Sequence, residues 1–107
     1  MRIGEIQTAT VGDVTLGFRL SWGDLKQINR ELQALPSRNA DPEAHLDFAE
    51  EKLLRHVVTC EGLDDAEGKP VKKLSEQVID DLPPAFVNSA IVAMLRAGEE
   101  VGGRGNA

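Results

Sequence analysis

The sequence has few of the residues that most often mark a chemical site. Among 107 residues there is a single cysteine, Cys60, so no disulfide can form within the chain. Tyrosine is absent and aromatic residues make up only 4% of the chain, which disfavours a platform on which nucleic-acid bases could stack. The core must therefore be built mainly from aliphatic side chains.

Long apolar runs and an excess of positive charge are also absent. The longest apolar runs contain only a handful of residues, too few to cross a membrane. Residues Met1–Glu5 lack the apolar core of a signal peptide. A formal net charge of −6 disfavours direct binding to a phosphate backbone. We therefore expect a cytoplasmic protein that binds neither membranes nor nucleic acids, or one whose partner is basic.

The N-terminal part of the chain shows the period of β-strands. Apolar and polar residues alternate from Val14 to Leu20, which predicts a half-buried strand. Residues 2–9 alternate more weakly, and Gly12-Asp13 between the two runs is a turn signal. The sequence thus predicts a β-hairpin, which must pack on helices because two strands alone are barely stable.

Helical periodicity follows the hairpin, with start and stop signals at each helix. Ser21 and Asp24 form a variant of the capping box before a first helix over 22–35. A second helix begins at Pro42 after the N-cap Asp41 and is expected to end near Val58. The β-branched run Val57–Cys60 could instead be extended, and the sequence does not decide between the two.

The C-terminal third is predicted to contain a polar loop, two helices and a tail. A polar loop over 61–73 is acidic before Gly68 and basic after it. A two-turn helix over 75–82 and a last helix from Pro84 to about Ala97 follow. Together these features predict one mostly helical α+β domain over 1–97, in which the hairpin packs on about four helices. With Gly98 as C-cap, residues 98–107 are expected to form a flexible, glycine-rich tail.

The residues with reactive or metal-binding side chains do not form a recognised site. His56 and Cys60 would share a helical face, but two ligands are too few for structural zinc. His45 lies about 16 Å further along the same predicted helix, too far to join them. Neither Asp64 nor Asp65 begins a loop with the acid and glycine positions of an EF-hand. Because no serine lies in a nucleophile elbow and a His56–Cys60 pair is an unusual catalytic arrangement, we expect a protein that is not an enzyme and needs no cofactor.

Apolar side chains remain as candidates for contact with a partner. Trp22 is interpreted as a lid on the core, with an interface anchor as the alternative. The widest apolar stripe, on the last helix, is interpreted as core, with a partner-binding groove as the alternative. The candidate partner-binding residues are Trp22, Leu25, Phe86, Ile91, Met94 and Leu95.

Four segments in this order are similar to a known family. They are Val14–Leu25, Asp41–Ala44, Leu53–Val58 and Asp80–Phe86 before a closing helix. The arrangement resembles the small tail assembly chaperones of tailed phages, prophages and gene-transfer agents. The resemblance implies a non-enzymatic protein that coats a long helical tape measure protein and recruits tail tube subunits. Association into a homo-oligomer is an alternative that the sequence leaves open. An acidic inhibitor that binds a basic protein by mimicking DNA is the alternative function.

Overall fold

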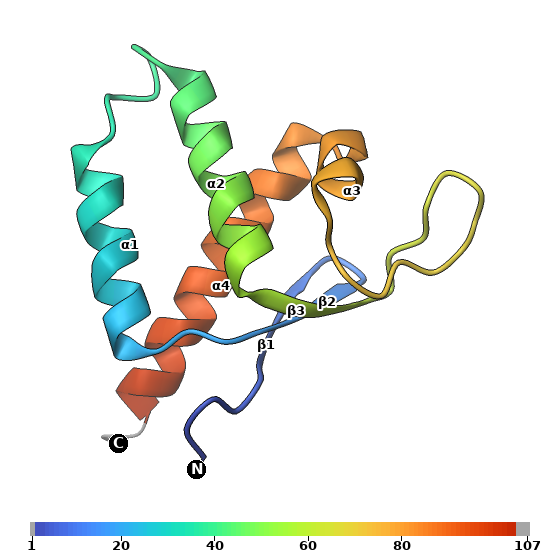
Figure 1. Ribbon diagram of the computed structural model, residues 1–107, viewed down its shortest axis with the longest axis horizontal. Coiled ribbons are helices and arrows are strands. Elements are labelled where there is room, and N and C mark those ends of the chain that lie inside the picture. Colours follow the sequence, from blue (N-terminus) through green and yellow to red (C-terminus); the bar gives the residue numbers. More distant parts are fainter. Residues whose placement is uncertain (1, 105–107) are drawn as a thin grey trace.

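The computed structural model describes residues 2–104, within which three strands and four helices follow one another (Figure 1). They are β1 (Gln7–Val11), β2 (Val14–Phe18), α1 (Trp22–Ala34), α2 (Pro42–His56), β3 (Val57–Glu61), α3 (Glu76–Asp81) and α4 (Pro84–Arg104). This confirms the predicted α+β class, with an N-terminal hairpin and a mostly helical chain.

The strands form one antiparallel sheet in the order β1-β2-β3. The predicted hairpin is confirmed, with Val11 paired to Val14 on either side of the Gly12-Asp13 turn. Its first strand begins at Gln7, so the expected start near residue 2 was wrong. Ile3 and Ile6 are exposed and do not belong to the buried core.

The third strand was not predicted as such, and it corrects the end of the second helix. α2 ends at His56 rather than near Val58, and β3 begins at the next residue with Val57 in an extended conformation. The extended alternative for Val57–Cys60 is therefore the one adopted. β2 offers this segment a second strand edge to pair with, and β-branched residues fit a pleated sheet.

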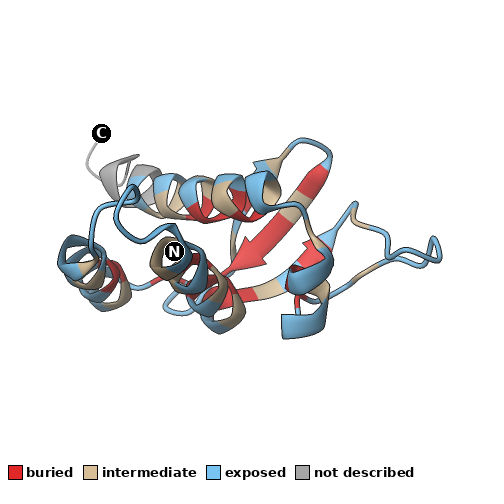
Figure 2. Ribbon diagram, turned by 90° about the horizontal axis from the view of Figure 1, so that it is seen from above, coloured by how far each residue is buried: buried red, intermediate tan, exposed pale blue. Residues whose placement is uncertain are grey.

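The two faces of the sheet differ in chemistry. Across the strands, Ala9, Leu16 and Cys60 form a buried row, which belongs to the hydrophobic core. In the next row Thr8 and Thr59 are exposed on either side of Gly17. Figure 2 shows the buried residues gathered where the strands meet the helices, with exposed residues on the outer surfaces. Helix α4 packs along β1 and against α2, so these two helices close the core.

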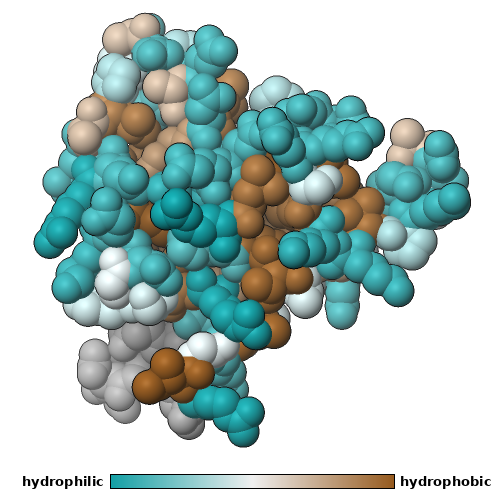
Figure 3. Space-filling view, viewed as in Figure 1, coloured by the Kyte–Doolittle hydropathy of each residue, from teal (hydrophilic) through white to brown (hydrophobic). Residues whose placement is uncertain are grey.

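The core is mainly aliphatic, as the composition requires. Its largest fully buried apolar side chains are those of Phe18, Leu16, Ile28, Leu53 and Met94. On the face shown in Figure 3, hydrophobic atoms also reach the surface in a band between α2 and the segment that leads to α3. Half-buried apolar residues of these elements, including Leu54, Leu63 and Val78, pack against the core. We therefore interpret this band as the edge of the core.

The helix starts agree with the sequence signals. Ser21 Oγ accepts a hydrogen bond from Asp24 N and Asp24 Oδ2 accepts one from Ser21 N, both at 3.0 Å, so the capping box at α1 is confirmed. Asp41 and Ser75 cap α2 and α3 in the same way through the backbone nitrogen three residues later. Pro84 is the first residue of α4.

The end of the last helix differs from the prediction. α4 continues through Gly98 to Arg104, so an end near Ala97 with Gly98 as C-cap was wrong. A Cβ at position 98 would lie 3.2 Å from Leu20 Cδ1, which shows that the glycine allows close packing of the helix rather than ending it. Of the expected tail, residues 105–107 lie outside the described part of the chain.

Lys52 is a buried charge that the sequence did not reveal. Its side chain is 1% exposed, and its Nζ lies 2.5 Å from Glu31 Oε2 and 3.4 Å from Glu51 Oε1. The ammonium group also lies 5.5 Å from the centre of the Phe48 ring. A buried lysine needs such partners because an isolated charge is costly to desolvate. The pair with Glu31 therefore fastens α1 to α2.

Two glycines with similar dihedral angles provide a test of the packing around β3. Gly62 has φ +86° and Gly68 has φ +84°, but only at Gly62 would a Cβ clash, 2.2 Å from the Asp13 carbonyl oxygen. We expect Gly68→Ala to cost about 1–2 kcal/mol for the unfavourable backbone angle. Gly62→Ala should cost clearly more, because the hairpin turn must also move. Urea unfolding of both variants checks this, and equal losses would contradict the close contact.

A second test uses neighbouring residues of α4. Ile91 is 6% exposed and Val92 is 38% exposed. Ile91→Asp should lower the free energy of unfolding by several kcal/mol, because an unpaired carboxylate would enter the core. Val92→Asp introduces the same group on the surface and should leave the thermal midpoint nearly unchanged. Similar midpoints for the two variants, measured by circular dichroism, would show that this face of α4 is not core.

Candidate functional site

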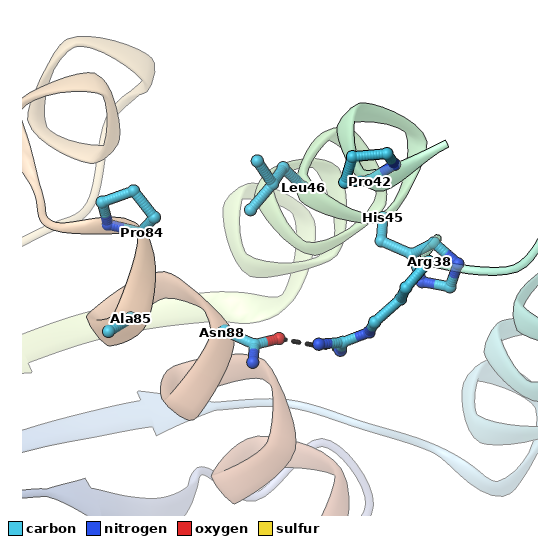
Figure 4. A pocket seen from close by; sticks show the side chains of 7 residues that line it. All are labelled: Arg38, Pro42, His45, Leu46, Pro84, Ala85 and Asn88. Carbon is cyan, nitrogen blue, oxygen red and sulfur yellow. Dashed lines mark hydrogen bonds between the residues drawn. The ribbon is translucent and has the colours of Figure 1, made fainter. Parts of the chain in front are cut away.

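The described residues form a shallow hollow on the outer side of α4. It consists of two adjoining depressions that share Asn88, and together they form what we call the α2–α4 groove. The first, of about 270 Å³, lies between the α1–α2 linker, α2 and the start of α4, whereas the second, of about 390 Å³, is lined by α4 alone. Figure 4 shows the first of them, between α2, the beginning of α4 and the linker before α2. The groove is lined by Arg38, Pro42, His45, Leu46, Pro84, Ala85, Asn88, Ser89, Val92, Ala93 and Arg96.

Local sequence signals position the groove walls. Two helices begin at the groove, at Pro42 and at Pro84, because proline fits the first turn of a helix. The linker between α1 and α2 is held in place by hydrogen bonds. Arg38 Nη2 donates to Asn88 Oδ1 of α4 at 3.0 Å (Figure 4). His45 Nε2 donates to the Pro36 carbonyl oxygen at 2.7 Å.

The floor of the groove is apolar and its charged residues are basic. Leu46 and Val92 are 43% and 38% exposed, which is high for large aliphatic side chains. Arg38 and Arg96 supply positive charge, and no Asp or Glu of the described residues lines the groove. A surface hollow whose charged residues are all basic is unusual in a chain whose net charge is −6.

A cluster of four acidic residues lies on a neighbouring surface of α2 and α3. Burial, followed by the charges of Asp80, Glu76 and Asp47, raises the pKa of the Glu50 carboxyl above its ordinary value. The three charges show that carboxylates from two helices crowd together here. Basic and acidic charges are thus segregated on adjacent surfaces of the molecule.

The structure separates the six candidate partner-binding residues predicted from the sequence. Trp22 is 72% exposed at the start of α1, so its interpretation as a core lid was wrong. Leu25, Ile91 and Met94 are buried, which leaves them unavailable to a partner in this fold. Phe86 and Leu95 are half-buried and pack against the core. None of the six lines the α2–α4 groove.

The groove residues themselves were missed. On α4 they include Ala85, Asn88, Val92 and Arg96, which recur at helical spacing on the side opposite the core stripe. These residues are small, polar or single apolar side chains, as on any solvent-exposed helix face. The one signal in the sequence is that Val92 shares its helix face with Asn88 and Arg96, and a single apolar residue on a polar face is too common to predict a site.

The reactive residues are structural in this fold. His56 Nδ1 donates to the Arg19 carbonyl oxygen at 3.1 Å, while Arg19 N donates to the His56 carbonyl oxygen at 3.0 Å. Cys60 lies in β3, and burial, with a contribution from Glu61, raises the pKa of its thiol, which disfavours the reactive thiolate. Asp65 Oδ1 accepts hydrogen bonds from Glu67 N and Lys69 N, both at 2.9 Å, and so shapes the turn of its loop.

The described residues contain no group of three or more His, Cys, Asp or Glu side chains arranged to hold a metal ion. Among them, no helix combines the length and apolar character needed to cross a membrane.

The environment of His56 predicts a dependence of stability on pH. Burial lowers the pKa of His56 below 6.5, although Asp24 and the hydrogen bond to Arg19 act in the opposite direction. The unfolded chain therefore takes up a proton at higher pH than the folded chain. Stability contributed by neutral His56 is present above the unfolded pKa and is lost as the pH falls through the folded pKa.

We expect the free energy of unfolding of His56→Gln to fall less than that of the wild type as the pH is lowered from about 7.5 to about 5.5, the range in which histidine titrates. Urea unfolding of the wild type and the variant at several pH values measures the difference in slope. Because other titrating groups are common to both proteins, the comparison isolates His56. Identical slopes would show that the folded and unfolded chains protonate this ring equally.

Comparison with known proteins gives no further guide to function. No protein-family model, curated protein or solved structure matches the chain. The α2–α4 groove and the charges around it therefore carry the functional argument.

Proposed function

We propose that this protein is a non-enzymatic assembly chaperone that holds an apolar helical segment of a larger partner in the α2–α4 groove. The observation that carries this proposal is the pair of exposed aliphatic side chains in adjoining depressions: Leu46 lies between α2 and α4, and Val92 lies in the next depression along α4. A groove between helices with an apolar floor suits the apolar face of a third helix.

The dimensions of the groove support a helical ligand. On α4 the lining residues extend from Pro84 to Arg96, which corresponds to about 18 Å along the helix axis. A ligand helix in contact over that distance presents roughly three turns. Leu46 on α2 and Val92 on α4 come from different helices, so the ligand can contact both elements.

The resemblance to tail assembly chaperones suggests the identity of the partner. A tape measure protein is a long helical protein that exposes apolar faces until the tail tube encloses it. Many copies of a small acidic chaperone, bound along it in the bacterial host cytoplasm, would cover these faces and keep the assembly soluble. Multiple sites on one chain also raise the overall affinity without stronger individual contacts. Tail tube subunits and further copies of this chain are additional candidate partners.

A second candidate function is inhibition of a basic protein by an acidic surface. The crowded carboxylates of Asp47, Glu50, Glu76 and Asp80 favour it, because closely spaced negative charge resembles a phosphate backbone. Ionic strength separates the two functions. Binding by charge mimicry weakens steeply as salt is added, whereas binding in an apolar groove changes little.

A helical peptide with a leucine stripe provides a direct test of the groove. We expect Val92→Asp to weaken binding at least about tenfold, because a charge replaces an apolar contact of the kind worth 1–3 kcal/mol. Trp22→Ala should leave the affinity unchanged within about twofold, because Trp22 lies outside the groove. Fluorescence anisotropy at low and high salt measures both affinities. Weaker binding by Trp22→Ala alone would place the docking surface at the start of α1 instead.

A further inference from the structure

We propose that the α2–α4 groove selects apolar helical segments that carry acidic residues along their flanks, through Arg38 and Arg96. This inference rests on the proposed function and specifies the chemistry of its ligand. It also runs against the net charge of −6, from which a basic ligand would be expected.

Arg38 is placed to act as a charged border of the groove. Its linker is anchored next to α2, and its guanidinium reaches α4, where Nη2 donates to the uncharged Asn88 amide oxygen. A guanidinium carries five N–H donors and stays protonated at any relevant pH. The bond to Asn88 orients the group and leaves other donors for a carboxylate, which arginine binds well in a two-pronged geometry.

Arg96 provides a second positive charge at a defined spacing. It is exposed and lies eight residues after Asn88 on α4, which corresponds to about 12 Å along the helix axis. This distance is close to two helical turns. A ligand helix parallel or antiparallel to α4, with carboxylates about two turns apart on one flank, would meet Arg96 and the Arg38–Asn88 pair together.

The surrounding surface adds to this selectivity by repulsion. Asp47, Glu50, Glu76 and Asp80 lie on the neighbouring α2–α3 surface, outside the groove. They disfavour an acidic ligand on that surface, whereas the arginines favour one in the groove. A site that attracts the correct ligand while its surroundings repel it fixes both the position and the orientation of binding.

The test uses three synthetic helical peptides with the same leucine stripe and with flanks of glutamate, glutamine or lysine. At about 150 mM salt, where long-range fields are largely screened, the wild type should bind the glutamate peptide about tenfold more tightly than the lysine peptide. The double variant Arg38→Glu with Arg96→Glu should reverse the order. The matched control Lys26→Glu with Arg30→Glu makes the same change of charge on exposed residues of α1 outside the groove and should keep the wild-type order.

The outcomes distinguish this inference from the proposed function. Equal binding of all three peptides would overturn the selectivity and leave the groove as a site for apolar helices. Two results would show that the overall charge of the protein, and not the two arginines, decides which peptide binds. One is tighter binding of the lysine peptide by the wild type; the other is a reversed order of peptide affinities in the α1 control variant. Failure of all three peptides to bind would overturn the proposed function as well. Should the glutamate variant fail to fold by circular dichroism, Arg38→Gln with Arg96→Gln replaces it and is expected to abolish the preference.

Discussion

Burial of the central strand is the constraint on which the rest of the structure depends. Leu16 and Phe18 of β2 are completely inaccessible to solvent, and a strand buried in this way needs a neighbour on each edge and cover on its apolar face. β1 supplies one edge through the hairpin turn, and β3 supplies the other directly from the end of α2. α4 then packs along β1 and against α2. The two helices that border the groove are thus placed by the requirements of the sheet.

Features set by neighbouring residues were predictable, whereas features set by distant contacts were not. The N-caps Ser21, Asp41 and Ser75 act within one helical turn, so the sequence alone locates these helix starts. The strand conformation of Val57–Glu61 depends on a partner strand about forty residues earlier. In the sequence Gly98 likewise predicts the end of a helix. Its close approach to Leu20, a distant residue, explains why a glycine lies within the helix instead.

The groove was beyond sequence reasoning for a related reason. Its lining residues come from the α1–α2 linker, α2 and α4, and within each segment they look like an ordinary solvent-exposed face. Net charge hides the segregation that the fold creates, because it averages the basic groove with the acidic surface of α2 and α3. The apolar stripe that did stand out in the sequence serves the core, since the most regular hydrophobic pattern on a helix is the one required for packing.

The direct junction between α2 and β3 has a mechanical consequence for recognition. With no linker residue between His56 and Val57, α2 cannot turn about its axis or slide without disturbing the pairing of β3 with β2. The reciprocal bonds between His56 and Arg19 tie the same junction to the end of the hairpin. The α2 wall of the groove is therefore rigid, and the hydrogen bonds of Arg38 and His45 also hold the adjoining linker in place. A preformed wall loses little conformational entropy on association, so if the groove binds a ligand as proposed, even a short contact would suffice.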